Sequence, residues 1–164
     1  RVVTLVCDSG NKYLSKIYNP YWLDDHGMIE HPLTHDLRDL IARPYLRGEV
    51  VWAAPNETLQ QVYAKMRMFD VSQVPVMDGG ILCGLVDEAD ILLTVVGNEA
   101  GFGIAVGKVM RKKIETVDVG RPVTDLIPIL ERCRAVCVVD RDQFLGMITP
   151  VDFLNYLRKR TGKA

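Results

Sequence analysis

The sequence predicts a mixed α/β (α+β) protein in which one β-α-β-β-α unit occurs twice. Residues 81–92 and residues 144–154 each read as a buried strand that runs directly into the first turn of a helix. Their matching positions lie a constant distance apart along the chain: Gly84 and Gly146, Asp87 and Thr149, Asp90 and Asp152. With 164 residues, 48% hydrophobic and 25% charged, the chain is large enough to bury a core around both units.

The N-terminal stretch predicts a strand and a short helix that cannot fold alone. Residues 1–7 form an apolar, β-branched run, residues 8–11 have turn composition, and residues 12–18 have helical spacing. One strand and one short helix cannot bury themselves, and the first residue is an arginine next to the strand. We therefore expect this stretch to be the end of a larger domain in a longer protein.

Residues 24–42 are polar and irregular, which predicts a linker with one short helix over residues 34–41. His31 and His35 have the spacing of metal ligands on a helix, but Pro32 lies between them and no third ligand accompanies them. We interpret both as exposed linker histidines and expect no metal site.

The first copy of the repeat begins near Glu49. A turn and helix start are expected at residues 55–58, and a hairpin turn at Asp78-Gly79-Gly80. The expected elements are a strand at 50–54, a helix around 59–66, strands at 71–77 and 81–86, and a helix at 88–96.

The second copy follows a glycine-rich connection at residues 97–107. Pro128 lies inside one expected helix, where it should cause a kink or a local break. The expected elements are a strand at 114–119, a helix at 123–132, strands at 135–139 and 144–148, and a final helix.

Composition excludes several classes of partner. A net charge of -1 and a pI near 6.3 give no electrostatic reason to expect nucleic acid or an anionic membrane surface. No apolar run is long enough for a membrane span and no secretory signal opens the chain, so we expect a cytoplasmic location. The cysteines lack zinc-site spacing and are interpreted as buried, reduced thiols: Cys7, Cys83, Cys133 and Cys137.

The segment from Cys7 to Ser15, followed by Tyr21-Trp22-Leu23, resembles the end of the catalytic domain in the cystathionine β-synthase and cysteine synthase family. The resemblance implies that the longer protein binds pyridoxal phosphate and makes cystathionine or cysteine from serine or an activated serine. The lysine that binds the cofactor would lie upstream, so neither Lys12 nor Lys16 is a candidate for it. Lys12 stands where the family usually has arginine.

The repeat, with Gly-apolar-apolar-(Ser/Thr)-x-x-Asp at its last strand-helix corner, resembles the tandem CBS domain, or Bateman module. The resemblance implies two domains related by pseudo-two-fold symmetry, a homodimer, and an adenosyl effector such as S-adenosylmethionine, AMP or ATP. The expected boundaries are a catalytic-domain remnant at 1–28, a linker at 29–44, CBS domains at 45–97 and 107–160, and a connection at 98–106.

The corner at Thr149 to Asp152 has two interpretations. Threonine, proline and an acid three residues on form a good helix start without any ligand. Alternatively, Asp152 accepts hydrogen bonds from ribose hydroxyls, and Thr149 and the helix N–H groups face an anionic group. We favour the ligand because capping does not require Gly146. The expected main site comprises Val71, Ser72, Gln73, Val74, Thr149, Val151 and Asp152.

The corner at Asp87 to Asp90 departs from the family pattern, because Asp87 stands where serine or threonine is usual. Two carboxylates there oppose a phosphate unless Arg134 neutralises one of them. We expect a second, weaker or empty site formed by Asp87, Asp90 and Arg134.

Three functions remain possible from the sequence. The leading hypothesis is a regulatory module that binds an adenosyl ligand, dimerises, and governs a pyridoxal-phosphate enzyme through its catalytic domain. The second is a purely structural dimerisation module whose corners are only capped helices. The third, that the chain is an enzyme by itself, lacks a paired base and nucleophile, so we expect no catalytic residues here.

Overall fold

The computed structural model describes Tyr18, Leu23, Met28 and residues 34–161. The strand expected at 1–7, the helix expected at 12–18 and His31 lie outside the described residues, as does most of the predicted catalytic-domain remnant. Contacts divide the chain into residues 1–34 and 35–164. The second of these units holds both repeats and the candidate site.

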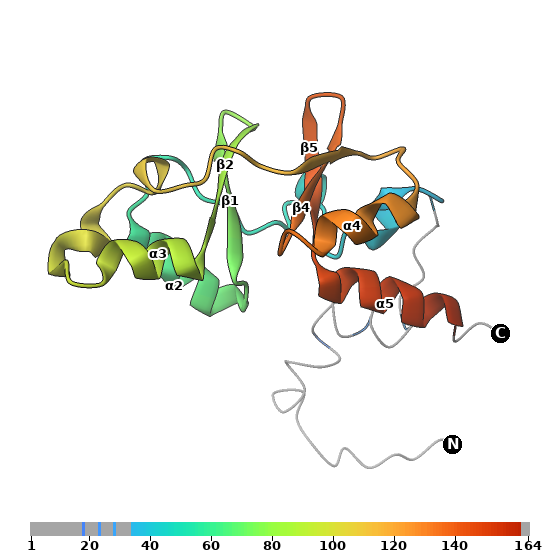
Figure 1. Ribbon diagram of the computed structural model, residues 1–164, viewed down its shortest axis with the longest axis horizontal. Coiled ribbons are helices and arrows are strands. Elements are labelled where there is room, and N and C mark those ends of the chain that lie inside the picture. Colours follow the sequence, from blue (N-terminus) through green and yellow to red (C-terminus); the bar gives the residue numbers. More distant parts are fainter. Residues whose placement is uncertain (1–17, 19–22, 24–27, 29–33, 162–164) are drawn as a thin grey trace, which may run out of the picture. The chain divides into compact units, whose positions relative to one another are not determined.

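The first repeat consists of two helices packed on a hairpin (Figure 1). Its elements are α2 (Leu59–Phe69), β1 (Gln73–Asp78), β2 (Ile81–Asp87) and α3 (Glu88–Val95). A complete capping box between Thr58 and Gln61 starts α2 at the predicted place. The hairpin turn has positive φ at both Gly79 and Gly80, which is the backbone of a type I′ turn and favours glycine at both positions.

The strand expected at residues 50–54 does not form, apart from one parallel bridge between Ala53 and Val76. Ala53 exchanges two hydrogen bonds with β1, donating to the Pro75 carbonyl and accepting from the Met77 N–H. The next rung on one side would need an N–H on Pro75, and the next on the other side would need an N–H on Pro55. Because proline has no such donor, the ladder stops after one pair.

The second repeat has a complete parallel strand at the equivalent place, because Val119 and Cys137 replace the two prolines. The Val119 N–H donates to the Val139 carbonyl, and the Cys137 N–H donates to the Glu115 carbonyl. The order of its three-stranded sheet is β3-β4-β5. Its elements are β3 (Thr116–Asp118), the 3-10 turn η6 (Val123–Leu126), α4 (Ile127–Leu130), β4 (Val136–Asp140), β5 (Gln143–Ile148) and α5 (Pro150–Thr161). The helix expected at 123–132 is divided between η6 and the single turn of α4, which contains Pro128. The predicted break at this proline is confirmed.

Two short segments precede the repeats, and each packs on the repeat that does not follow it directly. We call residues 37–48 the first strap and residues 99–110 the second strap. The first contains η2 (Leu37–Leu40) and η3 (Tyr45–Arg47); the second contains η4 (Glu99–Gly103) and η5 (Val106–Lys108). Figure 1 shows the chain after the second strap running past β2 before it enters the second repeat, where Arg111 bridges to Leu85.

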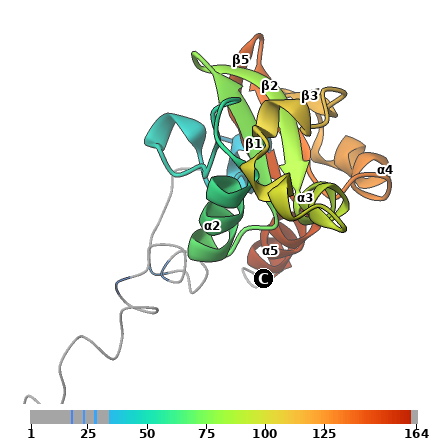
Figure 2. The same ribbon diagram turned by 90° about the vertical axis from the view of Figure 1, so that its left-hand side faces the viewer.

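The straps complete the hydrophobic cores. Leu37, Leu40 and Ile41 of the first strap are buried in the core of the second repeat, with Leu126, Val138 and Ile148. Ile104, Val106 and Val109 of the second strap pack in the core of the first repeat, which includes α2 and α3 (Figure 2). The domain boundaries stay a prediction, but part of the linker expected at 29–44 is core structure.

A third cluster joins the two repeats through one face of each sheet. Met77 of β1 is buried against Cys137 of β4 and Phe144 of β5, together with Val50. Cys137 is a free thiol whose pKa is raised to about 12 by burial, so it stays protonated near neutral pH. Cys83 and Cys133 are also free thiols, but they are half-buried, so the predicted burial holds only for Cys137 among the three cysteines within residues 34–161.

Candidate functional site

The second corner, Thr149 to Asp152, is a closed ring of hydrogen bonds at the start of α5. The backbone N–H of Thr149 donates to Asp152 Oδ2 over 2.7 Å, and the Thr149 hydroxyl donates to the same oxygen over 2.6 Å. The N–H of Asp152 points back to Thr149 Oγ1 at 3.4 Å. The hydrogen bonds that a helix cap requires are therefore present at this corner.

Burial raises the pKa of Asp152 above its ordinary value, although the bonds from Thr149 and the nearby charge of Arg43 act in the opposite direction. Arg43 belongs to the first strap and also donates from Nη2 to the Phe69 carbonyl at the end of α2, over 3.1 Å. Sequence reasoning missed Arg43, because it lay in a stretch interpreted as linker. The second corner is thus a desolvated carboxylate with a cation beside it.

The first corner, Asp87 to Asp90, is also a capping box. The N–H of Asp87 donates to Asp90 Oδ2 and the N–H of Asp90 donates to Asp87 Oδ1, both over 2.9 Å. Arg111 ion-pairs with both carboxylates, at 2.8 Å to Asp87 and 3.1 Å to Asp90. From the sequence we expect Arg134 to be the cation at this corner. The structure places Arg111 there instead, because the chain after the second strap runs beside β2.

The predicted main site divides between the two corners. β1 and β2 are antiparallel with Gln73 directly opposite Asp87 and Val74 opposite Val86, so the start of β1 lies beside the first corner. Thr149 and Asp152 bond to each other in the second corner, and Val151 is 64% exposed on α5. Arg43 is one polar link between the halves, because it bonds to Phe69 and its charge acts on Asp152.

The straps explain why the repeat motif has glycine at positions 84 and 146. A Cβ on Gly146 would collide with the side chain of Ile41 and lie 3.2 Å from the Arg43 carbonyl oxygen. A Cβ on Gly84 would collide with the side chain of Met110. The close approach that the sequence assigned to a ligand is therefore made by the protein itself, and Gly146 no longer favours a ligand over a cap.

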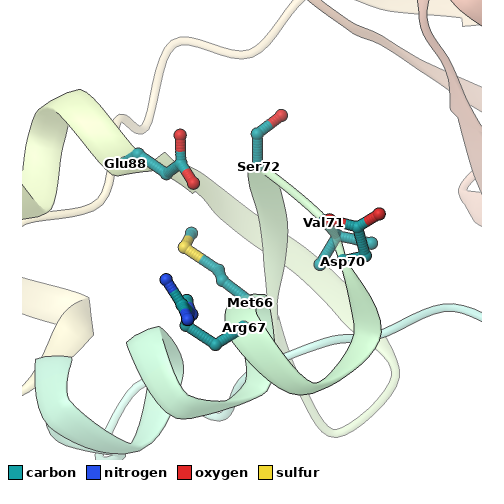
Figure 3. Close-up of a pocket in the computed structure, with 6 residues that line it drawn as sticks. All are labelled: Met66, Arg67, Asp70, Val71, Ser72 and Glu88. Carbon is teal, nitrogen blue, oxygen red and sulfur yellow. The ribbon is translucent and has the colours of Figure 1, made fainter.

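A pocket of about 450 Å³ lies next to the first corner, between the end of α2 and the start of α3 (Figure 3). Two of its residues, Val71 and Ser72, belong to the predicted main site. Its remaining lining residues are Met66, Arg67, Asp70 and Glu88. The pocket carries two carboxylates and one guanidinium, so its charge does not favour a phosphate.

Metal binding and membrane spanning each require a feature that can be looked for in residues 34–161 and the three other described positions. No group of three or more His, Cys, Asp or Glu side chains there could hold a metal ion. No helix in this part of the chain has the length and apolar character that crossing a membrane requires.

Comparisons with a family model and with a known protein point to the same family. The CBS domain model matches residues 37–97 and 106–159. The CBS domain-containing protein YhcV of Bacillus subtilis (strain 168) is 22% identical over 102 residues, which cover 61% of this chain and 73% of YhcV.

Solved structures agree in fold. A CBS domain-containing protein of unknown function from Bacillus anthracis (strain Ames Ancestor) superposes with a TM-score of 0.68 and 21% identity, covering 76% of this chain and 94% of that one. CBSX2, solved in complex with AMP, superposes with a TM-score of 0.67 and 19% identity, covering 77% and 98%. At these identities the likeness establishes the architecture alone.

Proposed function

The chain belongs to the CBS domain family, and from this premise we propose that it is a regulatory module that binds an adenosyl compound and dimerises. One observation carries the proposal: the charge of Arg43, in the first strap, acts on Asp152, while the Arg43 guanidinium bonds to the Phe69 carbonyl of the first repeat. A helix cap is complete without a cation from a distant segment. A ligand with ribose hydroxyls and a phosphate needs both an acceptor carboxylate and a cation.

In this proposal Asp152 accepts the ribose hydroxyls at the second corner, and Thr149 lies beside them. Arg43 and the N–H groups of the first turn of α5 face the phosphate. Val71 and Ser72 line the pocket beside the first corner and come shortly after Phe69, whose carbonyl Arg43 binds, so we assign them to the far side of the site. Val151 borders the site on α5. AMP or ATP suits this charge arrangement, S-adenosylmethionine is the effector suggested by the enzyme family, and the AMP complex of CBSX2 supports an adenosyl compound generally.

Calorimetric titration with AMP, ATP and S-adenosylmethionine tests the proposal. We expect at least one to bind, and Asp152→Ala to weaken it tenfold or more, because a charged acceptor is lost. Asp142→Ala, at the exposed turn between β4 and β5, is the matched control and should bind as the unchanged protein does. Arg43→Met should weaken AMP more than adenosine, because only AMP carries the phosphate.

The competing function is a structural dimerisation module without a ligand. It is favoured by the completeness of both capping boxes and by the apolar residues exposed on α3 and α5. If none of the three adenosyl compounds binds, this second function stands and sensing is excluded.

We further propose that the longer protein is a pyridoxal-phosphate enzyme of the cystathionine β-synthase type, with its catalytic domain as partner of this module. The support is the sequence from Cys7 to Ser15, which lies outside the described residues. The present chain should show no turnover when it is mixed with pyridoxal phosphate and serine, because the cofactor lysine would lie upstream.

A further inference from the structure

We propose that Arg111 closes the first corner: its guanidinium occupies the two carboxylates there, and Asp87 is the residue that holds it in place. The second corner, where Thr149 stands at the position of Asp87, stays open. The chain therefore takes one adenosyl compound, at the second corner. The closing contact does not depend on the proposed function, but the number of ligands per chain rests on it.

The first step is that each corner receives an arginine from a different part of the chain. Met110 of the second strap lies against the glycine of the first-repeat corner, and Arg111 is the next residue. Ile41 of the first strap lies against the glycine of the second-repeat corner, and Arg43 comes two residues later. The same packing arrangement therefore supplies one guanidinium to each corner.

The second step is that the two guanidiniums are used differently. Arg111 pairs with both carboxylates of the first corner, at 2.8 Å and 3.1 Å. Arg43 bonds to the Phe69 carbonyl over 3.1 Å, and its effect on Asp152 is that of a nearby charge. The arginine of the first corner is thus locked onto the acids, and the arginine of the second corner is directed to the end of α2.

The third step is the residue that makes this difference. Asp87 and Thr149 hold matching positions in the two repeats, and each accepts a backbone N–H as a helix cap. Either residue type serves as a cap. Only the aspartate adds a second negative charge to the corner. Two carboxylates attract a guanidinium more strongly than one does, and its separate N–H groups bind both at once.

The fourth step is that Arg111 covers the acids. The side chains of Asp87 and Asp90 are 8% and 18% exposed, whereas the side chain of Arg111 is 49% exposed. The guanidinium is therefore the group that solvent meets, and the carboxylates lie beneath it. Removing the arginine would leave a buried charge without its partner, so the contact resists opening.

The fifth step is the anchoring of the main chain. The Arg111 N–H donates to the Leu85 carbonyl over 2.8 Å, and the Leu85 N–H donates to the Arg111 carbonyl over 3.0 Å. These two bonds hold the backbone of Arg111 beside β2. The side chain therefore starts from a fixed point next to the corner, which lowers the entropy lost when it closes the corner.

Proton exchange at the Arg111 side chain tests the closing contact without any ligand. Nuclear magnetic resonance of the ¹⁵N-labelled chain follows exchange of the Arg111 Nε–H proton with water, and Arg111→Lys assigns the signal. Asp87→Thr keeps a cap and removes one charge, so it should speed this exchange about tenfold or more, because the guanidinium loses a charged acceptor. Asp125→Thr is the control, since it removes an aspartate paired with Arg121, and should leave the exchange unchanged.

Calorimetric titration with AMP, ATP and S-adenosylmethionine tests the consequence. Each compound that binds should bind once per chain. Binding of two molecules per chain would overturn the closure of the first corner. If none of them binds, the proposed function fails, while the proton exchange still decides on the closing contact.

An exchange rate in Asp87→Thr equal to that of the unchanged chain would show that Asp87 does not hold Arg111, whatever the number of ligands. Adenosyl binding at the second corner would stand in that case. Asp87→Asn, which also caps a helix without a charge, provides a second variant in case Asp87→Thr does not fold.

Discussion

At the scale of single residues, the same atoms that cap a helix can also bind a ligand. Asp152 Oδ2 accepts from the N–H and from the hydroxyl of Thr149, which satisfies a helix start that would otherwise have free donors. Burial at this position removes water from the carboxylate, which raises its pKa. An acid that is partly desolvated before a ligand arrives loses less hydration on binding.

The raised pKa of Asp152 predicts a specific dependence of stability on pH. Because the folded protein holds this proton more tightly than the unfolded chain, the stabilisation is fully present below the ordinary pKa of about 3.9 and is lost as pH rises through the folded pKa. Asp152→Asn does not titrate. The unchanged protein should therefore gain free energy of unfolding relative to Asp152→Asn as pH falls from 7 toward 4.

Urea unfolding at a series of pH values measures this difference. Asp142→Asn removes one negative charge at an exposed turn and controls for the change of net charge. A difference between Asp152→Asn and the unchanged protein that is constant with pH, or that changes in the opposite direction, would contradict the assignment.

At the scale of elements, the straps determine how closely each strand-helix corner can be approached. The first strap lies against Gly146 of β5, and the second lies against Gly84 of β2. Both positions need glycine because another segment of the same chain occupies the space of a side chain. The glycine of the repeat motif therefore reflects, in part, the packing of the first strap on the second repeat and of the second strap on the first repeat.

Gly146→Ala should lower the free energy of unfolding by about 1–3 kcal/mol, because the added methyl group overlaps Ile41 in a packed core. Gly103→Ala is the control, since a Cβ there meets no atom within 4 Å. Chemical denaturation of the single variants and of Gly146→Ala combined with Ile41→Ala gives the coupling between the two positions. If the cost of Gly146→Ala is the same with and without Ile41→Ala, the overlap with Ile41 is not its cause.

At the scale of the whole molecule, the chain exposes apolar residues on two equivalent helices. Leu92 and Leu93 of α3 are 58% and 81% exposed, and Leu154 of α5 is 63% exposed. Leu92 and Leu154 hold matching positions in the two repeats. Apolar residues repeated at equivalent surface positions suit a symmetric contact between two copies of the chain, which is the proposed dimer.

Combining Leu93→Glu with Leu154→Glu should convert the proposed dimer to a monomer, because charge would be buried without a partner. The fold should change in stability by only about 0.5 kcal/mol, since both side chains are exposed in the single chain. Sedimentation equilibrium measures the mass. Ile81→Glu, at the 68% exposed start of β2, is the control and should remain dimeric. A monomeric unchanged chain, or a dimeric double variant, would contradict the proposal.

Much of the fold could be predicted because its signals are local. Hairpin turns, capped helix starts and alternating strands depend on neighbouring residues, so Gly79-Gly80 and the capping residues Thr58 and Asp87 mark their elements directly. The strand expected at 50–54 fails to form for a reason that lies partly outside that segment. Pro55 and Pro75 remove the donors on both sides of Ala53, and the pairing partner had to be known before that mattered.

By itself the sequence determined the repeated unit, the positions of both corners and the residues that cap them, because these follow from periodicity and short-range bonding. Only the tertiary structure decided which segment lies beside which corner. The first strap packs on the second repeat, which brings the charge of Arg43 near Asp152. The second strap packs on the first repeat, and Arg111, which follows it, pairs with Asp87. The strand register places Gln73 opposite Asp87. Such pairings depend on burying apolar surface between segments far apart in the chain, so they cannot be predicted from the spacing of residues in the sequence.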